Sequence, residues 1–205
     1  MKNNEKKQGG DDDVKEMGPG EVALAGLFGG ESEGLERHGV MMLMDEIKSD
    51  SVKPIIEWIL KNNLSPQQEQ LQLIINSSGG SVTDAFALID TMRGSSVPIW
   101  TVGLGEISSS GLMIFMAGEK GYRTLTPNTA ILSHQYSWGK WGKEHELVTA
   151  SRGFDLTSEM IMNHYMKCTG MTEKKVRTLL LPPHDVWLSA KEAKKYGICD
   201  NIKGI

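Results

Sequence analysis

Residues 71–92 read LQLIINSSGGSVTDAFALIDTM, and this stretch decides the fold class. Residues 71–75 are a short apolar run, which predicts a buried strand, and residues 76–80 are the small and polar residues typical of a turn. The remainder predicts a helix with one apolar face, formed by Ala85, Leu88, Ile89 and Met92. A strand that passes through a glycine turn into a helix indicates the first half of a βαβ unit.

The same alternation continues toward the carboxyl end. Residues 99–102 predict a second strand, residues 105–111 (GEISSSG) a tight serine turn flanked by glycines, and residues 112–117 an apolar helix. Residues 130–133 are a third strand-like run, which ends just before His134. Strands that alternate with helices predict an α/β fold with a largely parallel sheet.

A long helix is predicted from near Lys143 to Gly170, where glycine is a natural stop. Its apolar stripe repeats every seven residues and comprises Leu147, Phe154, Ile161 and Cys168, with Ala150 and Tyr165 in the same stripe. The stripe belongs either to the core or to a contact between subunits, and the length of the helix favours the contact. A capping box of Ser189 and Glu192 predicts the start of the last helix, and Gly197 its end.

The chain divides by composition into two parts. Residues 1–37 are rich in glycine and acidic residues, and we expect a mobile amino-terminal segment. An apolar patch within it, residues 22–28, could dock on the body or on another subunit. Residues 38–205 are the predicted globular domain. Its first helix is predicted around residues 52–59, with Asp50 or Ser51 as cap and Pro54 in the first turn.

Bulk composition argues against several classes of function. The 205 residues carry a formal net charge of -4, which gives no reason to expect a nucleic-acid partner. Cys168 and Cys199 form neither a CxxC pair nor a ligand cluster with the histidines, so we expect no metal and a reducing, cytoplasmic location. We expect no membrane span, since no apolar run reaches about 18 residues, and no secretory signal. The phosphate-binding loop of ATPases is also missing from the sequence.

Three segments at predicted strand ends could carry chemistry: Gly79-Gly80, Ser108-Ser-Ser110 and His134. In open α/β sheets, sites form beyond the carboxyl ends of the strands, so these segments should converge. Glycine turns can point backbone N–H groups at an oxyanion, a serine can act as nucleophile, and a histidine as its base. The alternatives stay open from pattern alone: a serine that only caps the helix, an ordinary glycine turn, and a structural histidine. The strict Gly-x-Ser-x-Gly spacing is not met.

Several ordered motifs between about residues 40 and 202 carry a family resemblance. They are Asn76-Ser-Ser-Gly-Gly80, Asp90-Thr-Met92, Ser109-Ser-Gly111, Ala117-Gly118, Lys120-Gly-Tyr-Arg123, Pro127-Asn128, His134-Gln135 and Leu188-Ser-Ala-x-Glu-Ala-x-x-Tyr-Gly197. In this order and spacing, the sequence resembles ClpP, the proteolytic subunit of the Clp protease. The resemblance implies a serine peptidase with a Ser-His-Asp triad.

The resemblance assigns the site residue by residue. It makes Ser109 the nucleophile, His134 the general base and Asp185 the orienting acid, with the N–H groups of Gly80 and Ser110 as oxyanion hole. The interval from Ser109 to His134 is that of the family, whereas the interval from His134 to Asp185 is slightly longer, which residues 181–183 would accommodate. The sequence departs from the family at three places in the site, where it has Ser78, Ser110 and Tyr136 instead of Pro, Met and Pro.

The resemblance also implies an architecture and partners. The fold would be a ββα-spiral like that of crotonases, with the helix of residues 143–168 as a protruding handle. Two heptameric rings would stack through these handles, and the sites would face a chamber that admits unfolded or threaded chains. No cofactor is expected, and ATP would act only through a separate Clp-type unfoldase. At positions where the family has aromatic docking residues, this chain has Gln72, Ile74 and Gly94, so we expect weakened docking.

Three other functions are compatible with parts of this pattern. A catalytically silent ring subunit is disfavoured because all three triad members are present. A crotonase-type acyl-CoA enzyme is disfavoured by the same residues. A specialised processing peptidase, for example one that matures viral capsids, would fit the divergent docking positions.

Overall fold

The computed structural model describes residues 31–204. The chain separates into two compact units, residues 1–34 and residues 35–205, and the second holds the sheet and the site. The apolar patch at residues 22–28 and most of the segment expected to be mobile lie outside the described residues. Of that segment the structure describes α2 (Glu31–Arg37), a short helix.

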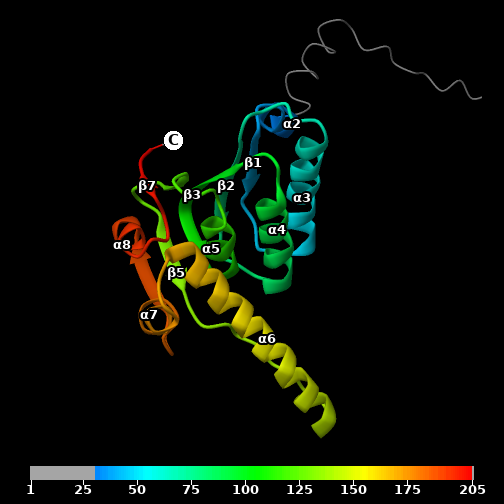
Figure 1. Cartoon of the computed structure of the whole chain (residues 1–205), viewed down its shortest axis with the longest axis vertical. Helices are drawn as coiled ribbons and strands as arrows, with labels where there is room; N and C mark the ends of the chain where they lie inside the picture. The colour runs from blue at the N-terminus through cyan, green and yellow to red at the C-terminus, as the bar shows by residue number, and fades with distance from the viewer. Residues whose placement is uncertain (1–30, 205) are drawn as a thin grey trace, which may run out of the picture. The chain divides into compact units, whose positions relative to one another are not determined.

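A mixed α/β architecture is confirmed, with a sheet that is parallel except at one edge (Figure 1). Five parallel strands lie in the order β1 (Val40–Leu43), β2 (Leu71–Ser77), β3 (Ile99–Ser108), β4 (Arg123–Leu125) and β7 (Asn201–Ile202). Off this path, β5 (Ala130–Ser133) runs parallel to β3, and β6 (Val186–Ser189) runs antiparallel to β5. The antiparallel pair brings the segment before β6 next to the segment after β5.

The strand β3 is longer than the sequence pattern predicts. We expected it to stop near residue 102 and to be followed by a serine turn, but it continues to Ser108. Its first half pairs with β4 and its last three residues pair with β5, so the sheet divides along this strand. Gly105 lies at the division with a φ of 67°, a conformation that glycine adopts without strain. The consequence is that β2, β3 and β5 end at one edge of the sheet.

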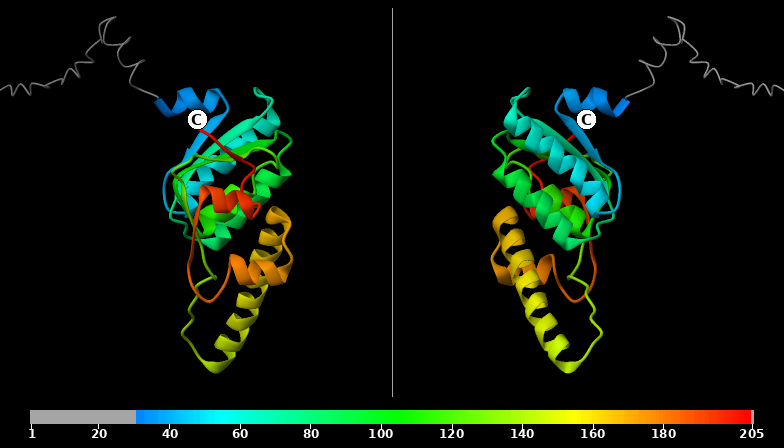
Figure 2. Two further views of the ribbon diagram at one scale, coloured as in Figure 1. Left: turned by 90° about the vertical axis from the view of Figure 1, so that its left-hand side faces the viewer. Right: turned by 90° about the vertical axis from the view of Figure 1, so that its right-hand side faces the viewer.

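Helices cover the sheet as the apolar patterns require. The helix α3 (Ser49–Leu64) lies beside α4 (Val82–Gly94), whose predicted apolar face is buried (Figures 1 and 2). The predicted cap of α3 is wrong, because the cap is Lys48 and Pro54 lies inside the helix. Ser51 still takes part, since its hydroxyl accepts the Lys48 N–H at 3.1 Å. Next along the chain, α5 (Ser109–Met116) is buried on nearly all sides.

The predicted long helix is α6 (Glu144–Thr169), with Lys143 as N-cap and Gly170 ending it at a φ of 74°. Figures 1 and 2 show its amino-terminal half projecting away from the sheet. The predicted stripe divides accordingly, because Cys168 at one end is buried whereas Leu147 at the other is 39% exposed. The carboxyl-terminal half is therefore core. A subunit contact through the other half stays a prediction.

The end of the chain anchors the carboxyl end of α6. After α7 (Glu173–Leu179) and α8 (Ala190–Lys195), Asp200 accepts a hydrogen bond from Arg123 at 2.7 Å. The same guanidinium donates to the carbonyl of Cys168 at 2.9 Å. Burial alone would raise the pKa of Asp200, but the hydrogen bonds from Arg123 hold it below the ordinary value. The predicted capping box of α8 is confirmed, with Glu192 accepting the Ser189 N–H at 2.8 Å.

Candidate active site

The junction between β3 and α5 places Ser109 in a strained conformation. Its φ of 54° is the only positive value at a non-glycine residue within residues 31–204. Strain of this kind, on the order of 1–2 kcal/mol, persists only where the surroundings enforce it, and it concentrates at functional sites. Gly79 is the enforcing neighbour, because a Cβ built there would lie 2.6 Å from the Cβ of Ser109. The backbone of the glycine turn therefore lies directly against the serine.

The glycine turn is held so that one backbone donor stays available. The N–H of Ile47 donates to the carbonyl of Gly79 at 2.8 Å, and the N–H of Ser81 donates to the carbonyl of Ile47 at 2.7 Å. These bonds leave the Gly80 N–H unused among the residues that the structure describes. The N–H of Ser110 belongs to the first turn of α5, where amides have no partner inside the helix. Two backbone donors thus lie near Ser109.

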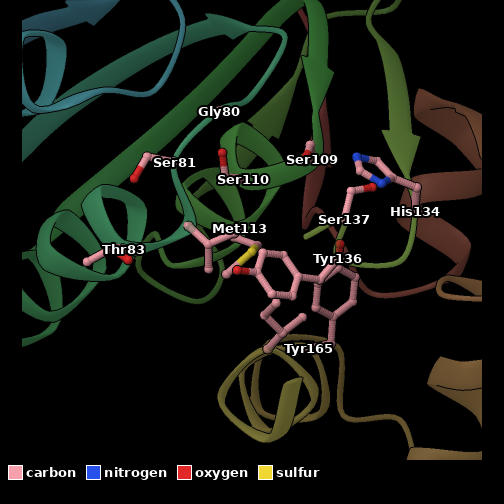
Figure 3. Close-up of a pocket in the computed structure, with 12 residues that line it drawn as sticks. Gly80, Ser81, Thr83, Ser109, Ser110, Met113, His134, Tyr136, Ser137 and Tyr165 are labelled. Carbon is pink, nitrogen blue, oxygen red and sulfur yellow. The ribbon is translucent and has the colours of Figure 1, made fainter. Parts of the chain in front are cut away.

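Both donors and the serine line a cavity of about 450 Å³. Figure 3 shows this pocket, whose lining residues are Gly80, Ser81, Val82, Thr83, Ser109, Ser110, Met113, His134, Tyr136, Ser137, Ile161 and Tyr165. Its apolar wall combines α5 with α6, two helices far apart in sequence. The sequence pattern placed Ile161 and Tyr165 in the apolar stripe but did not predict that they line a pocket, because a periodic pattern does not tell which residues border a cavity.

His134 follows β5 and lines the same pocket. Figure 3 shows its imidazole directed toward the side where Ser109 lies. The Nδ1 atom lies 2.7 Å from the carbonyl oxygen of Gln135, and since a carbonyl only accepts, Nδ1 carries the proton. The neutral ring then has its lone pair on Nε2. This is the tautomer that can accept a proton from a serine hydroxyl.

Asp185 lies beside His134 in the backbone but outside the pocket. In the antiparallel ladder Ser133 pairs with Val186, so continuing the register by one residue places residue 185 opposite residue 134. Directly opposed residues of an antiparallel pair have their side chains on the same face. The Asp185 side chain is nevertheless exposed, and within residues 31–204 no hydrogen bond joins it to His134. The structure therefore brings four of the five predicted site residues around one cavity and leaves Asp185 outside its lining.

Two polar groups of the pocket have no role as base. Burial raises the pKa of Tyr165 to about 12, so its phenol is protonated at neutral pH, and it lies 3.1 Å from the hydroxyl of Ser133. The Ser110 hydroxyl is the one buried side-chain polar atom without a partner among the described residues. Such an atom costs about 1–3 kcal/mol when it stays unpaired. Its backbone amide, not its hydroxyl, is the group that the geometry offers to a ligand.

Other chemistries find less support in the described part of the chain. Residues 31–204 contain no group of three or more His, Cys, Asp or Glu placed to hold a metal ion. In the same residues no helix combines the length and the apolar character needed to cross a bilayer.

These features fit a hydrolase of mixed α/β architecture whose site lies at the carboxyl ends of parallel strands. A family model described as Clp protease matches residues 31–204, which is most of the chain. The chain therefore belongs to the Clp protease family, and it is a peptidase of the ClpP type, a hydrolase. Peptidases of this family are generally serine proteases that need no cofactor, and they normally form rings and work with Clp ATPases.

Proposed function

We propose that the chain is a serine endopeptidase that cleaves unfolded or threaded polypeptides inside an oligomeric chamber. Ser109 is the nucleophile, His134 the general base and Asp185 the acid that orients it. The N–H groups of Gly80 and Ser110 form the oxyanion hole. The observation that carries this proposal is the strained backbone of Ser109, which holds the residue against a glycine turn and in one cavity with His134.

The proposed reaction is acyl transfer. The Ser109 hydroxyl attacks the peptide carbonyl while Nε2 of His134 takes its proton. The tetrahedral oxyanion accepts hydrogen bonds from the amides of Gly80 and Ser110, each of which contributes on the order of 3 kcal/mol to transition-state stabilisation. His134 then gives the proton to the leaving amine, and water hydrolyses the acyl-enzyme by the same steps in reverse.

Completion of the triad requires one exchange of hydrogen bonds. In the described chain Nδ1 of His134 donates to the carbonyl of Gln135. The ladder between β5 and β6 ends with the pair Ser133 and Val186, so residues 134 and 185 would face each other if the register continued by one residue. A rotation of the His134 side chain would redirect its Nδ1–H group from this carbonyl to the Asp185 carboxylate. Residues 134–137, which follow β5, are half-buried or exposed, so packing does not oppose this rotation.

Exposed apolar side chains support the ring assembly. They lie on α6 and on the segment before it, and comprise Trp138, Trp141, Leu147, Val148, Leu156 and Met160. Trp141 is 98% exposed, which is costly for an indole in water unless another surface covers it. We propose that a second copy of the chain covers this face in stacked heptameric rings. Light scattering that shows only a monomer at micromolar concentration would contradict this assembly.

The surface expected to bind an unfoldase differs from the sequence-based expectation in one respect. Gln72 lines a cavity of about 580 Å³ together with Trp100 and Tyr122. These two rings stack with their centroids 4.2 Å apart and an interplanar angle of 9°. An aromatic surface is therefore present beside Gln72. We propose that a Clp-type ATPase still docks here, more weakly than on an aromatic at position 72. Gln72→Tyr should then increase ATPase-stimulated proteolysis, and no change would contradict this.

A serine-directed fluorophosphonate tests the catalytic proposal. We expect it to label the wild type and not Ser109→Ala. Ser108→Ala is the matched control, because Ser108 adjoins Ser109 in the same junction but is buried, and its hydroxyl donates to Glu106 at 2.7 Å. Labelling of Ser109→Ala, or none of the folded wild type, would overturn the assignment. The second outcome is also what a catalytically silent ring subunit would give.

A further inference from the structure

The helix that begins with Ser109 receives a hydrogen bond from a side chain of another helix. At the end of α5 the N–H of Ala117 donates to the carbonyl of Ile114 at 3.1 Å, which tightens the last turn. The carbonyl of Met113, one residue earlier, accepts a hydrogen bond from Nε2 of His164 at 2.8 Å. A side chain of α6 thus binds the helix that carries the proposed nucleophile.

The protonation of His164 follows from its two partners. Nδ1 lies 2.8 Å from Nη2 of Arg93, and a guanidinium nitrogen only donates. Nδ1 must therefore accept, and Nε2 carries the proton that Met113 receives. The imidazole is neutral in this arrangement. A chain of two hydrogen bonds runs from Arg93 of α4 through His164 of α6 to the carbonyl of Met113 in α5.

The surroundings of His164 fix this state. The side chain is 2% exposed and packs edge-on against Phe86 of α4. Burial, followed by the positive charge of Arg93, lowers the pKa of His164 to about 4, and Lys167 acts in the same direction. The remaining titratable neighbours are Tyr165, whose ring lies 6.5 Å away, and Cys168, whose Sγ lies 3.7 Å from Nε2. None of these neighbours is a carboxylate, whose negative charge would favour the imidazolium.

We infer that His164 is a positioning residue for Ser109, an inference that rests on the proposed function. Apolar contacts surround most of α5, but they are not directional and do not by themselves fix a helix along its axis. A hydrogen bond to a main-chain carbonyl does. In an α-helix the N–H of residue 113 donates to the carbonyl of residue 109, so one helical hydrogen bond joins Met113 to the nucleophilic residue. His164 therefore sets the axial position of Ser109 and of the Ser110 amide, together with Thr101 of β3, whose hydroxyl donates to the carbonyl of Phe115 at 2.9 Å.

A matched pair of variants separates positioning from burial. His164→Gln keeps a donor at the place of Nε2, because its amide nitrogen lies equally far along the side chain. His164→Asn puts its amide at the place of Nδ1, which cannot reach Met113. Both variants bury one neutral amide. A small fluorophosphonate without peptide groups measures the reactivity of Ser109, and thermal unfolding measures stability. Cys168→Ala is a control on the same helix that leaves both hydrogen bonds intact.

We expect His164→Asn to be labelled about tenfold more slowly than the wild type, since small displacements of a nucleophile cost that much or more. His164→Gln should stay within about threefold, and Cys168→Ala within about twofold. Equal labelling rates of folded Gln and Asn variants would overturn the inference and leave the proposed function intact. Absence of label on the wild type would overturn both. If His164→Asn does not fold, His164→Met, which fills the space without a donor, replaces it with the same expected result.

Discussion

The two halves of the candidate site are built differently. In the half with Ser109, Gly80 and Ser110, two backbone amides lie beside the serine where the glycine turn after β2 meets the junction of β3 and α5, and two backbone hydrogen bonds to Ile47 fix that turn. The half with His134 and Asp185 consists of half-buried or exposed side chains just after β5 and just before β6, and within residues 31–204 its side chains have one hydrogen bond, from His134 to the carbonyl of Gln135.

This difference indicates which half of the site a single chain can form by itself. Backbone donors fixed by packing cannot reorient, so the oxyanion half is preorganised as soon as the chain folds. Side chains at an exposed edge can change partners at little cost. The half with His134 and Asp185 is therefore the part that a second copy would influence if it bound the exposed apolar face of α6. The following predictions test this contrast, starting with the largest effect.

Asp185→Asn tests whether the exposed half is needed for catalysis. An asparagine cannot stabilise the imidazolium, so kcat of the assembled protein should fall by about 10³- to 10⁴-fold. His184→Gln, a change at the exposed neighbouring residue, is the control and should keep activity. Peptide hydrolysis measures both. If Asp185→Asn stays within tenfold of the wild type, the carbonyl of Gln135 suffices as orienting group and the two halves are equally complete.

The pH dependence of stability tests how firmly the buried support of α5 is held. The pKa of His164 is about 4 in the folded chain and about 6.5 in an unfolded one. Between these values only the unfolded chain takes up the proton, so stability falls as the pH decreases from 6.5 to 4. The loss should approach about 3 kcal/mol. Urea unfolding at pH 7.5 and 4.5 measures it. His164→Gln should lack this loss, whereas His145→Gln should keep it.

Two substitutions at Ser109 measure the strain in the preorganised half. Both Ser109→Gly and Ser109→Ala remove the hydroxyl and should be inactive. Glycine adopts a φ of 54° freely, whereas alanine does not, so the glycine variant should be more stable by about 1 kcal/mol. Urea unfolding compares the two variants. Equal stability would mean that the junction relaxes, and that backbone strain does not hold the nucleophile.

The smallest effect is expected at Ser110. Ser110→Ala removes a buried hydroxyl that has no partner in the described residues and retains the backbone N–H. We expect a stability gain of about 0.5 kcal/mol, because an unpaired buried hydroxyl is unfavourable. Peptidase activity should stay within about threefold, since only the amide is used. A tenfold loss of activity would show that the hydroxyl itself takes part.

Much of the fold could be predicted from local patterns, and the exceptions have physical causes. The strand of residues 130–133, the apolar face of α4 and both ends of α6 were predicted and are confirmed. The full length of β3 was not, because Gly103 and Gly105 read as breakers within a strand. A Cβ at Gly103 would crowd Cδ1 of Ile107 and, at 2.7 Å, Cδ2 of Leu125, and the second neighbour comes from another strand, β4. The short strands β1, β4, β6 and β7 were missed because short strands depend on their partners.

The sequence by itself determined the α/β fold class, because glycine turns and apolar periods at given spacings restrict the backbone locally. Its resemblance to ClpP supplied Ser109, His134 and Asp185 as candidates. Only the tertiary structure decided that α6 closes one wall of the pocket, that His164 binds the helix of Ser109, and that Asp185 lies at the edge of the site. These relations join residues more than 25 positions apart, and packing between elements, which no local pattern records, sets their distances.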